Sequence, residues 1–401
     1  MSEYDVIVWG ATGFTGKLVA RYLHETYGAD LKWAMGGRSQ AKLEMVRGSI
    51  GADVPLVVAD SDDEVSLGAM VEQAKVIATT VGPYARYGSK LVEACAATGT
   101  HYCDLTGEVQ WMRRMIDAHN TAAEESGARI VHTCGFDSIP FDLGVHVIQR
   151  EMMAQHGVFA NRVKTRVVDS RGGASGGTIE SMMNMMDEAK DDPSIFELLS
   201  DPYSLNPNNM PRGPDGADQF GVEYDMDFRA WTAPFVMAAI NTRVVRRSHA
   251  LKGYPYGDQF SYGEAMVTGN GPGGWAAASA IAGVSAMVGG AAAMAPLRNL
   301  MRRMAPAPGE GPSEQTMATG YYQIQMHAEH PDDKEKSVRL EIRGDRDPGY
   351  GSTSKMLAES ALCLAQDELE SPGGVTTPAA SMGDALVERL NAKAGVTFQV
   401  I

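Results

Sequence analysis

The chain has 401 residues, of which 44% are hydrophobic and 21% charged, with 19 prolines and 44 glycines. This length suits two or three domains with a sizeable core, and the composition excludes a disordered, collagenous or coiled-coil chain. Lys and Arg number 35 against 50 Asp and Glu, and the resulting net charge of −15 argues against nucleic acid as a partner.

The cysteines and the N-terminus bear on metal sites and location. The 4 cysteines never form a CxxC pair and the 9 histidines never form HExxH, so we expect reduced thiols and no metal site. The chain starts MSEYDVIVWG, with acidic residues before a short apolar run, unlike the basic start and longer apolar region of a secretory signal. The sequence therefore predicts a cytoplasmic protein.

Residues 4–132 repeat a short apolar run, a turn and an amphipathic stretch. The apolar runs are YDVIVWG, LKWAMGG, PLVVAD, KVIATTVG, THYCDL and ARIVHT. Strands that alternate with helices form a parallel sheet with helices on both faces. We therefore expect an α/β fold whose N-terminal domain, residues 1–135, is a doubly wound Rossmann sheet.

The pattern changes after Gly135, where a helix with Pro140 near its start is expected. Four later runs alternate well enough to be strands, namely 162–170, 259–269, 321–330 and 337–345, the last two as a hairpin. Residues 136–348 are therefore predicted as a second α+β domain on a mixed or antiparallel sheet. Within it, 191–218 is rich in Pro, Asn, Asp and Gly and is expected to be irregular.

The chain ends with residues 349–401, predicted as two amphipathic helices and a closing strand, VTFQVI. Gly373 and Gly374 are expected to separate the two helices.

An uncharged segment, residues 275–297, precedes Arg298, Arg302 and Arg303. Its length would suit a membrane span, but Ala and Gly dominate it, so the insertion energy per residue is poor. Three covers stay open. They are protein, either this chain's second domain or a partner subunit; a peripheral contact of 275–303 with lipid; and a true span.

Three glycines, Gly10, Gly13 and Gly16, lie between the first strand and the first helix in VIVWGATGFTGKLVARYL. In a dinucleotide-binding fingerprint the first permits the tight turn, the second lets the backbone approach the pyrophosphate, and the third lets helix and strand pack closely. The helix N-terminus supplies free N–H groups for the phosphates. The alternative is a glycine-rich turn without a ligand. The residues expected to contact the cofactor here are Gly10, Thr12, Gly13, Phe14, Thr15 and Gly16.

The end of the second strand indicates which cofactor is bound. Where an NAD enzyme presents Asp or Glu to the ribose 2′-hydroxyl, this chain has Arg38. An acid repels a 2′-phosphate whereas an arginine fork pairs with it, so NADP(H) is favoured. Ser39 and Lys42 are expected to assist. The alternative is that Arg38 is only a solvated loop residue.

Later strand ends supply the other cofactor candidates, because ligands of such sheets bind at the carboxyl ends of the strands. Asp60 is expected at the adenine. Thr80, Gly82 and Pro83 are expected beside the nicotinamide.

Hydride transfer often needs an acid to protonate the atom that gathers charge. Tyr84, Tyr87 and Asp137 are the candidate catalytic residues, with Asp104 and Glu108 as further polar candidates at strand ends. Each could instead serve the fold, because tyrosines after a Gly-Pro turn commonly pack and carboxylates commonly cap helices.

Methionine is abundant, with 24 residues. The cluster in SMMNMMDEAK comprises Met182, Met183, Met185 and Met186. Flexible thioethers suit an adaptable apolar pocket, and the alternative, somewhat favoured, is ordinary core packing.

Several motifs resemble those of the saccharopine dehydrogenase-like oxidoreductases, and the likeness runs nearly the whole chain. They are GATGFTG, GGRS, TTVGPYARYG, HYCDLTGE and CGFDSIPFDLG. Three more, ASGGTIESMM, GDRDPGYGSTSKMLAESALCLA and GGVTTPAASMGDALVERL, resemble the branch that includes the trans-acting enoyl reductases of polyketide-derived lipid assembly. The resemblance implies a Rossmann domain, a second domain on a mixed sheet, and a C-terminal segment that packs back near the first domain.

We therefore expect an NADPH-dependent oxidoreductase that reduces a hydrophobic, acyl-type substrate at an enoyl double bond, and we expect a homodimer. Saccharopine itself would need several basic groups for its carboxylates, and no such cluster stands out in the sequence. A dehydrogenase of an amino acid or imine is the alternative enzyme. A non-catalytic NADP(H)-binding sensor or scaffold is the alternative class, because the fingerprint requires binding but not chemistry.

Overall fold

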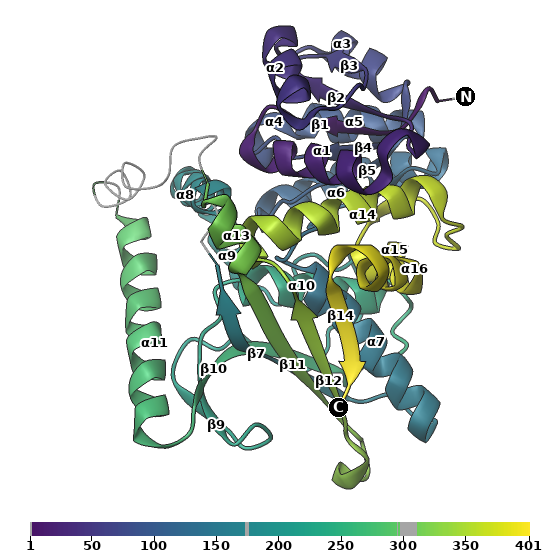
Figure 1. The fold of residues 1–401 in the computed structure, drawn as a ribbon. Helices are drawn as coiled ribbons and strands as arrows, with labels where there is room; N and C mark the ends of the chain where they lie inside the picture. The colour runs from purple at the N-terminus through teal and green to yellow at the C-terminus, as the bar shows by residue number, and fades with distance from the viewer. Residues whose placement is uncertain (1, 173–175, 295, 297–310) are drawn as a thin grey trace.

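In a computed structural model, the chain forms two sheets of seven strands each. Figure 1 shows one sheet above the other. The structure describes residues 2–172, 176–294, 296 and 311–401. Arg298, Arg302 and Arg303 lie outside the described residues.

The first sheet is parallel throughout, in the order β13-β6-β5-β4-β1-β2-β3. Its strands are β1 (Tyr4–Trp9), β2 (Trp33–Gly37), β3 (Leu56–Val58), β4 (Ala74–Thr79), β5 (His101–Cys103), β6 (Arg129–Val131) and β13 (Gly374–Thr376). Strands β1 to β6 follow the order of a doubly wound Rossmann sheet, so the predicted fold class is confirmed. The intervening helices are α1 (Phe14–Tyr27), α2 (Gln40–Ile50), α3 (Glu64–Val71), α4 (Tyr84–Tyr87), α5 (Ser89–Thr98) and α6 (Val109–Ser126), with a short 3-10 turn, η1 (Gly28–Asp30), after α1.

Strand β1 illustrates why an apolar run becomes a central strand here. Successive side chains point to opposite faces, so Val6 and Val8 enter one core while Ile7 and Trp9 enter the other. All four are almost completely buried. A parallel strand covered on both faces needs such a continuous apolar run.

The seventh strand, β13, comes from the C-terminal segment and was not expected. Val375 pairs with Ile130 of β6, so a strand begins at Gly374, within the glycine pair that was predicted only as a break. Three residues are too few to show the alternation of a strand in the sequence. This segment becomes a strand because the edge of β6 is free to pair with it.

The second sheet has the order β14-β12-β11-β7-β10-β9-β8 and is mixed, because β7 and β10 are parallel and the other pairs antiparallel. Its strands are β7 (Arg162–Arg171), β8 (Glu223–Asp225), β9 (Ala230–Ala233), β10 (Ser261–Gly269), β11 (Tyr321–Glu329), β12 (Val338–Gly344) and β14 (Val396–Val400). The mixed sheet and the β11–β12 hairpin confirm the prediction, with the short turn η2 (Lys334–Lys336) inside the hairpin loop. Strands β8 and β9 were not predicted.

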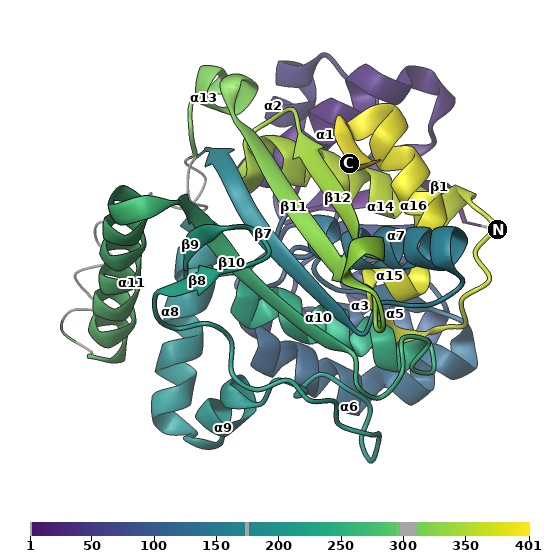
Figure 2. The ribbon, with the colours of Figure 1, turned by 90° about the horizontal axis from the view of Figure 1, so that it is seen from below.

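Two helices pack on this second sheet, as Figure 2 shows from below. Helix α7 (Ile139–His156) contacts β11 and β12, and α10 (Ala238–Leu251) contacts β10. The sequence predicted α7 but not α10. Three arginines of α10 are almost fully buried. Charged residues therefore occupy buried positions of this helix, and its sequence lacks the clear apolar face by which an amphipathic helix is recognised.

The C-terminal segment contributes to both sheets. Helix α14 (Thr353–Gln366) packs against α1, β1, β4 and β5 and lies between the sheets in Figure 1, while β14 pairs with β12. One hydrophobic core therefore runs from Val6 of the first sheet through Leu357 of α14 to Ile324 of the second. The short elements α15 (Pro378–Ser381), α16 (Gly383–Arg389) and η4 (Leu390–Ala394) connect β13 to β14.

Residues 191–218 differ from the irregular segment expected, because helix α9 (Ser194–Ser200) lies within them. The preceding helix, α8 (Gly176–Asp191), carries the methionine cluster. The buried arginines of α10 hold this segment. Arg243 donates to the carbonyl of Leu199 in α9, Arg246 to that of Pro202 and Arg247 to that of Leu205. The guanidinium groups thus supply the hydrogen bonds that these backbone carbonyls would otherwise receive within a strand or a helix.

Helix α11 (Gly271–Ala293) contains most of the uncharged segment. It contacts β9, β10 and α8, and beyond those contacts it stands apart from the body in Figure 1. Helix α13 (Glu314–Thr319) follows it in the described chain. Within the described ranges, no helix combines the length and the hydropathy needed to cross a bilayer.

Candidate active site

Gly10 and Gly16 shape the turn that joins β1 to α1. Gly10 has a φ of 87°, and a Cβ there would lie 2.7 Å from Cγ2 of Val81. A Cβ on Gly16 would lie 2.1 Å from the carbonyl oxygen of Gly10. Glycine at these two positions is therefore needed for the turn and for the packing of α1 on the strand end.

Gly13 is different, because the fold alone tolerates a side chain there better. It is exposed, its φ is −76°, and a Cβ would have one close neighbour, the carbonyl oxygen of Gly10 at 3.3 Å. Gly13 precedes α1, whose first turn has no acidic residue and whose first N–H groups lack intrahelical acceptors. The space that a side chain would fill is where a phosphate meets those N–H groups, so the turn fits a dinucleotide. Thr12 and Thr15 are half-buried around it.

Phe14 connects this turn to the C-terminal segment. Its ring meets the ring of Tyr350 edge to face, with centroids 4.8 Å apart, and Tyr350 lies in η3 (Pro348–Ser352). Just beyond, Oγ1 of Thr353 accepts the N–H of Phe136 at 3.0 Å. The motif GDRDPGYGST therefore lies beside both the turn that joins β1 to α1 and the end of the first domain. The sequence assigned no site residue to it, and the only signal was its family resemblance.

Arg38 follows the end of β2. Its side chain is exposed and forms no ion pair with a described residue, so its charge is free for a ligand. Oγ of Ser39 accepts the N–H of Lys42 at 3.4 Å, which makes Ser39 the cap of α2, and the Lys42 side chain is exposed. Arg38 and Ser39 follow directly on β2, and Lys42 lies in the first turn of α2. Their contact with a cofactor stays a prediction.

Asp60 follows β3 and has a local bonding role. Its carboxylate accepts the N–H of Asp62 at 3.0 Å, and its own N–H donates to Oγ of Ser66 at the same distance. The residue thus shapes the turn before α3, at the edge of the sheet that carries Arg38.

Thr80 ties the end of β4 to the glycine turn. Its hydroxyl lies 3.3 Å from the carbonyl oxygen of Gly10 and 3.4 Å from that of Trp9, and it donates to this pair. Gly82 and Pro83 follow, joined by a cis peptide bond, with Gly82 exposed. These residues lie next to the turn in space, although some 70 positions separate them in the chain.

Tyr84 and Tyr87 have opposite surroundings. The Tyr84 hydroxyl is buried, donates to the carbonyl oxygen of Thr79 at 3.3 Å and accepts the N–H of Leu105 at 3.2 Å. Burial and the nearby Asp104 raise the pKa of Tyr84 well above its usual value, so this phenol gives up a proton reluctantly. Tyr87, in contrast, is 37% exposed.

Glu108 holds the turn that bears Tyr84. Its carboxylate accepts the N–H groups of Tyr84 at 2.8 Å and Ala85 at 3.0 Å, and the hydroxyl of Ser181 at 2.8 Å. Burial raises the pKa of Glu108, and these three donors partly offset that effect. Since Ser181 belongs to α8, Glu108 also joins α8 to the expected nicotinamide end of the sheet.

Asp104 is saturated by hydrogen bonds. The residue is fully buried, and its carboxylate accepts hydrogen bonds from the hydroxyl of Tyr102 and the backbone N–H groups of Thr106 and Thr133. The carboxylate also lies 2.8 Å from Nδ1 of His132. A carboxylate with this many partners braces the ends of β5 and β6. It is a poor proton donor for a substrate.

Asp137 is the acid without such partners. It lies between β6 and α7, half-buried, and its carboxylate makes no hydrogen bond or ion pair with a described residue. Burial raises the pKa of Asp137 to about 7. A carboxyl group with this pKa is half protonated at neutral pH and can donate a proton. Across the described ranges, no group of His, Cys, Asp and Glu is arranged to hold a metal ion.

Comparisons with known proteins place the chain in a family. Residues 6–131 match the Saccharopine dehydrogenase NADP binding domain. Relatives named as trans-acting enoyl reductases include one from Mycobacterium tuberculosis, 41% identical over 425 aligned positions that span 99% of this chain and 97% of its own. Another, from Mycobacterium leprae, is 39% identical over 407 positions, with 97% and 96% covered.

Among solved structures, the saccharopine dehydrogenase (L-Glu forming) of Saccharomyces cerevisiae matches 99% of both chains with a TM-score of 0.52. At 12% identity this likeness concerns the fold alone. The full-length relatives carry the assignment, and the N-terminal domain has the family's NADP-binding fold. The chain belongs to the saccharopine dehydrogenase-like family and resembles, over nearly its whole length, relatives named as trans-acting enoyl reductases.

Proposed function

We propose that this protein is an NADPH-dependent oxidoreductase that reduces the carbon–carbon double bond of a hydrophobic acyl substrate. The observation that carries the proposal is the similarity, over nearly the full chain, to relatives named as trans-acting enoyl reductases. The free charge of Arg38 at the end of β2 supports NADPH over NADH.

Asp137 is our candidate for the proton donor. Thr80, Gly82 and Pro83 would hold the nicotinamide of NADPH, which would supply a hydride to one alkene carbon. The other carbon takes a proton from the Asp137 carboxyl, so one π bond is lost and two C–H bonds form. The unpartnered carboxyl and its raised pKa favour Asp137 over Tyr84 and Asp104, whose polar atoms are already bonded.

The acyl chain is placed along α8 in this proposal. The hydroxyl of Ser181 donates to Glu108, which also holds the turn that bears Tyr84, so α8 is fixed beside the expected nicotinamide position. Met183 is buried in the core, whereas Met182, Met185 and Met186 are only half-buried and remain adaptable.

The test is turnover with a panel of substrates. Mixing the protein with NADPH and 2-enoyl thioesters of increasing chain length should oxidise the cofactor and give saturated thioesters, identified by mass spectrometry. Turnover only with amino acids or imines would replace the proposal with a dehydrogenase of that class. Cofactor binding without turnover of either class would leave an NADP(H)-binding sensor or scaffold.

We further propose that α11 is covered by lipid, in a peripheral contact. Residues 283–290 are all exposed. Eight consecutive residues face every direction around a helix, and a partner helix covers only one stripe of it. None of these residues is charged, and Trp275 at the start of α11 is 52% exposed, as suits an aromatic side chain at a membrane interface.

Vesicle flotation tests this contact. The whole chain should float with phospholipid vesicles, and a Val284→Glu, Met287→Glu variant should float less while its NADPH affinity stays unchanged. Equal flotation of both proteins would contradict the proposal. A concentration-dependent dimer that the variant loses would assign the helix to a second copy, consistent with the expected homodimer.

A further inference from the structure

A hollow of about 480 Å³ lies on the second sheet, on the face opposite to α7. Along β11, Ile324 and Met326 enter the core beneath α7, and His327 points to the other side because side chains alternate. The turn between β8 and β9 closes the hollow on one side and Arg339 of β12 on another. None of its lining residues belongs to the first sheet or to the dinucleotide turn.

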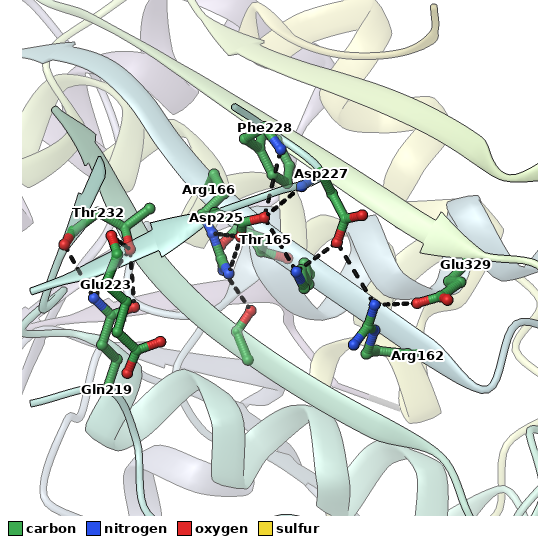
Figure 3. A network of polar contacts seen from close by, with 12 residues as sticks. Arg162, Thr165, Arg166, Gln219, Glu223, Asp225, Asp227, Phe228, Thr232 and Glu329 are labelled. Carbon is green, nitrogen blue, oxygen red and sulfur yellow. Dashed lines mark hydrogen bonds and ion pairs between the residues drawn. The ribbon is translucent and has the colours of Figure 1, made fainter. Parts of the chain in front are cut away.

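Ion pairs fix the β8–β9 turn across the sheet, as Figure 3 shows. Asp225 accepts from Nε of Arg166 at 2.9 Å and from Nζ of Lys164 at 3.1 Å. Asp227 accepts from the same lysine at 2.5 Å. The turn is therefore held before any ligand arrives, and a bound molecule would meet a preformed wall.

The acidic groups of the hollow are already neutralised. Asp227 pairs with Lys164 and lies 3.6 Å from Arg162, and Arg162 also pairs with Glu329. A cation ligand would have to displace one of these partners. The acids therefore do not favour a cation.

Two guanidinium groups, in contrast, have no carboxylate partner. Arg339 donates to the backbone carbonyl of Asp227 at 2.5 Å, and its Cζ lies 5.2 Å from the ring centre of Phe228. Arg229 is exposed and makes no ion pair with a described residue. In a chain with a net charge of −15, two uncompensated arginines beside one hollow form a local positive site.

The side chain of His327 adds a second feature. Its ring lies 6.4 Å from that of Phe228, and its Nδ1 atom is buried without a hydrogen-bond partner. A buried polar atom normally has a partner in the protein or a bound molecule. The ring itself lines the hollow together with Phe228 and Arg339.

We propose that this hollow binds the phosphate group of a small organic phosphate, through Arg229 and Arg339 and with His327 beside it. Planar guanidinium groups match phosphate oxygens in pairs, which is why arginine recurs at such sites. The volume is large enough for a phosphate group with a small organic body. The site is separate from the proposed active site and does not depend on the proposed function.

Calorimetric titration with inorganic pyrophosphate tests the proposal, using the full chain saturated with NADP⁺ so that the dinucleotide turn is occupied. We expect the wild type to bind pyrophosphate and Arg229→Ala to bind it roughly tenfold more weakly, as expected when one charged hydrogen-bond donor is lost. The matched control is Arg343→Ala, because Arg343 lies on the same strand and face as Arg339 but pairs with Glu341 outside the hollow. The control should change the affinity less than twofold.

Two results would overturn the site. One is the absence of pyrophosphate binding by the saturated wild type, and the other is an equal loss of affinity in both variants. Flotation with vesicles that contain phosphatidic acid identifies the source of the phosphate. Arg229-dependent flotation that pyrophosphate competes away assigns a lipid headgroup, and pyrophosphate binding without such flotation assigns a free metabolite.

Discussion

Arg38 is the residue that we propose distinguishes NADPH from NADH. Its side chain is exposed and unpaired among the described residues, so its interaction with a 2′-phosphate would be almost its whole energetic contribution. We expect Arg38→Ala to weaken NADPH binding by about 1.5 kcal/mol, a loss of roughly tenfold, and to leave NADH binding nearly unchanged. Fluorescence titration of both cofactors measures this.

Lys32→Ala is the matched control, because Lys32 is exposed and directly precedes the first residue of the same strand. It removes the same charge from the same domain. An equal loss for NADPH and NADH in the Arg38 variant would show that the arginine does not contact the 2′-phosphate.

Asp137 should give the reaction its pH dependence. Because burial raises its pKa to about 7, the carboxyl is protonated and active as an acid below that pH, and the rate should fall as the pH rises through it. We expect Asp137→Asn to lower kcat by roughly 100-fold or more and to remove this fall, with NADPH affinity unchanged. A rate profile of the variant that keeps the same fall would assign the titration to another group.

The turn between β1 and α1 allows a test at the level of an element, because its glycines have separate roles. A Cβ on Gly16 overlaps the carbonyl oxygen of Gly10, so Gly16→Ala should push α1 off the strand end and cost about 1–3 kcal/mol of unfolding free energy. A Cβ on Gly13 meets only the carbonyl oxygen of Gly10, at 3.3 Å, which a small shift of the turn relieves, so Gly13→Val should fold and lose both cofactors. Urea denaturation and cofactor titration separate the two effects.

The contrast between the two variants is the internal control. Normal NADPH affinity in a folded Gly13→Val protein would place the pyrophosphate elsewhere. An unfolded Gly13→Val protein would mean that the turn needs this glycine for its own conformation.

A buried hydrogen-bond chain links the parts of the whole molecule. Oγ of Ser138, next to Asp137, donates to Oδ1 of Asn241 on α10 at 3.2 Å, and Nδ2 of Asn241 donates to Glu264 of β10 at 2.9 Å. Tyr262 donates its hydroxyl to the same carboxyl at 2.8 Å. The start of α7 is thereby fixed to the second sheet.

Glu264 should make the stability of the protein depend on pH. Burial raises its pKa from 4.5 to about 8, so the stability it confers is complete below pH 4.5 and is lost as the pH rises through about 8. We expect Glu264→Gln to flatten this loss between roughly pH 5 and 8, by on the order of 4 kcal/mol, in urea denaturation curves.

Glu341→Gln is the control for that measurement. Arg343 lowers the pKa of Glu341, so this group is ionised in both the folded and the unfolded chain over the same pH range and adds no slope there. A wild-type slope that persists in Glu264→Gln would assign the titration to Asp137 or Asp142, whose pKa values burial raises to about 7 and about 6.

Local patterns in the sequence determined much of this protein. The alternation of apolar runs and amphipathic stretches predicted the parallel sheet, and the spacing of Gly10, Gly13 and Gly16 predicted the turn that fits a dinucleotide. Both properties depend on residues that are neighbours in the chain, because a strand period or a tight turn is set within a few residues. The position of Arg38 was predictable for the same reason, because Arg38 is the residue next to the end of β2.

Only the tertiary structure decided the rest, because it depends on what distant segments bring. Strand β13 forms because the edge of β6 is free to pair with it. Helix α10 can bury its arginines because backbone carbonyls about 40 residues earlier in the chain accept their hydrogen bonds. Asp104 and Asp137 look alike in the sequence. One carboxylate is surrounded by donors from two strand ends and the other has none among the described residues, and that difference in surroundings makes Asp137 the candidate acid.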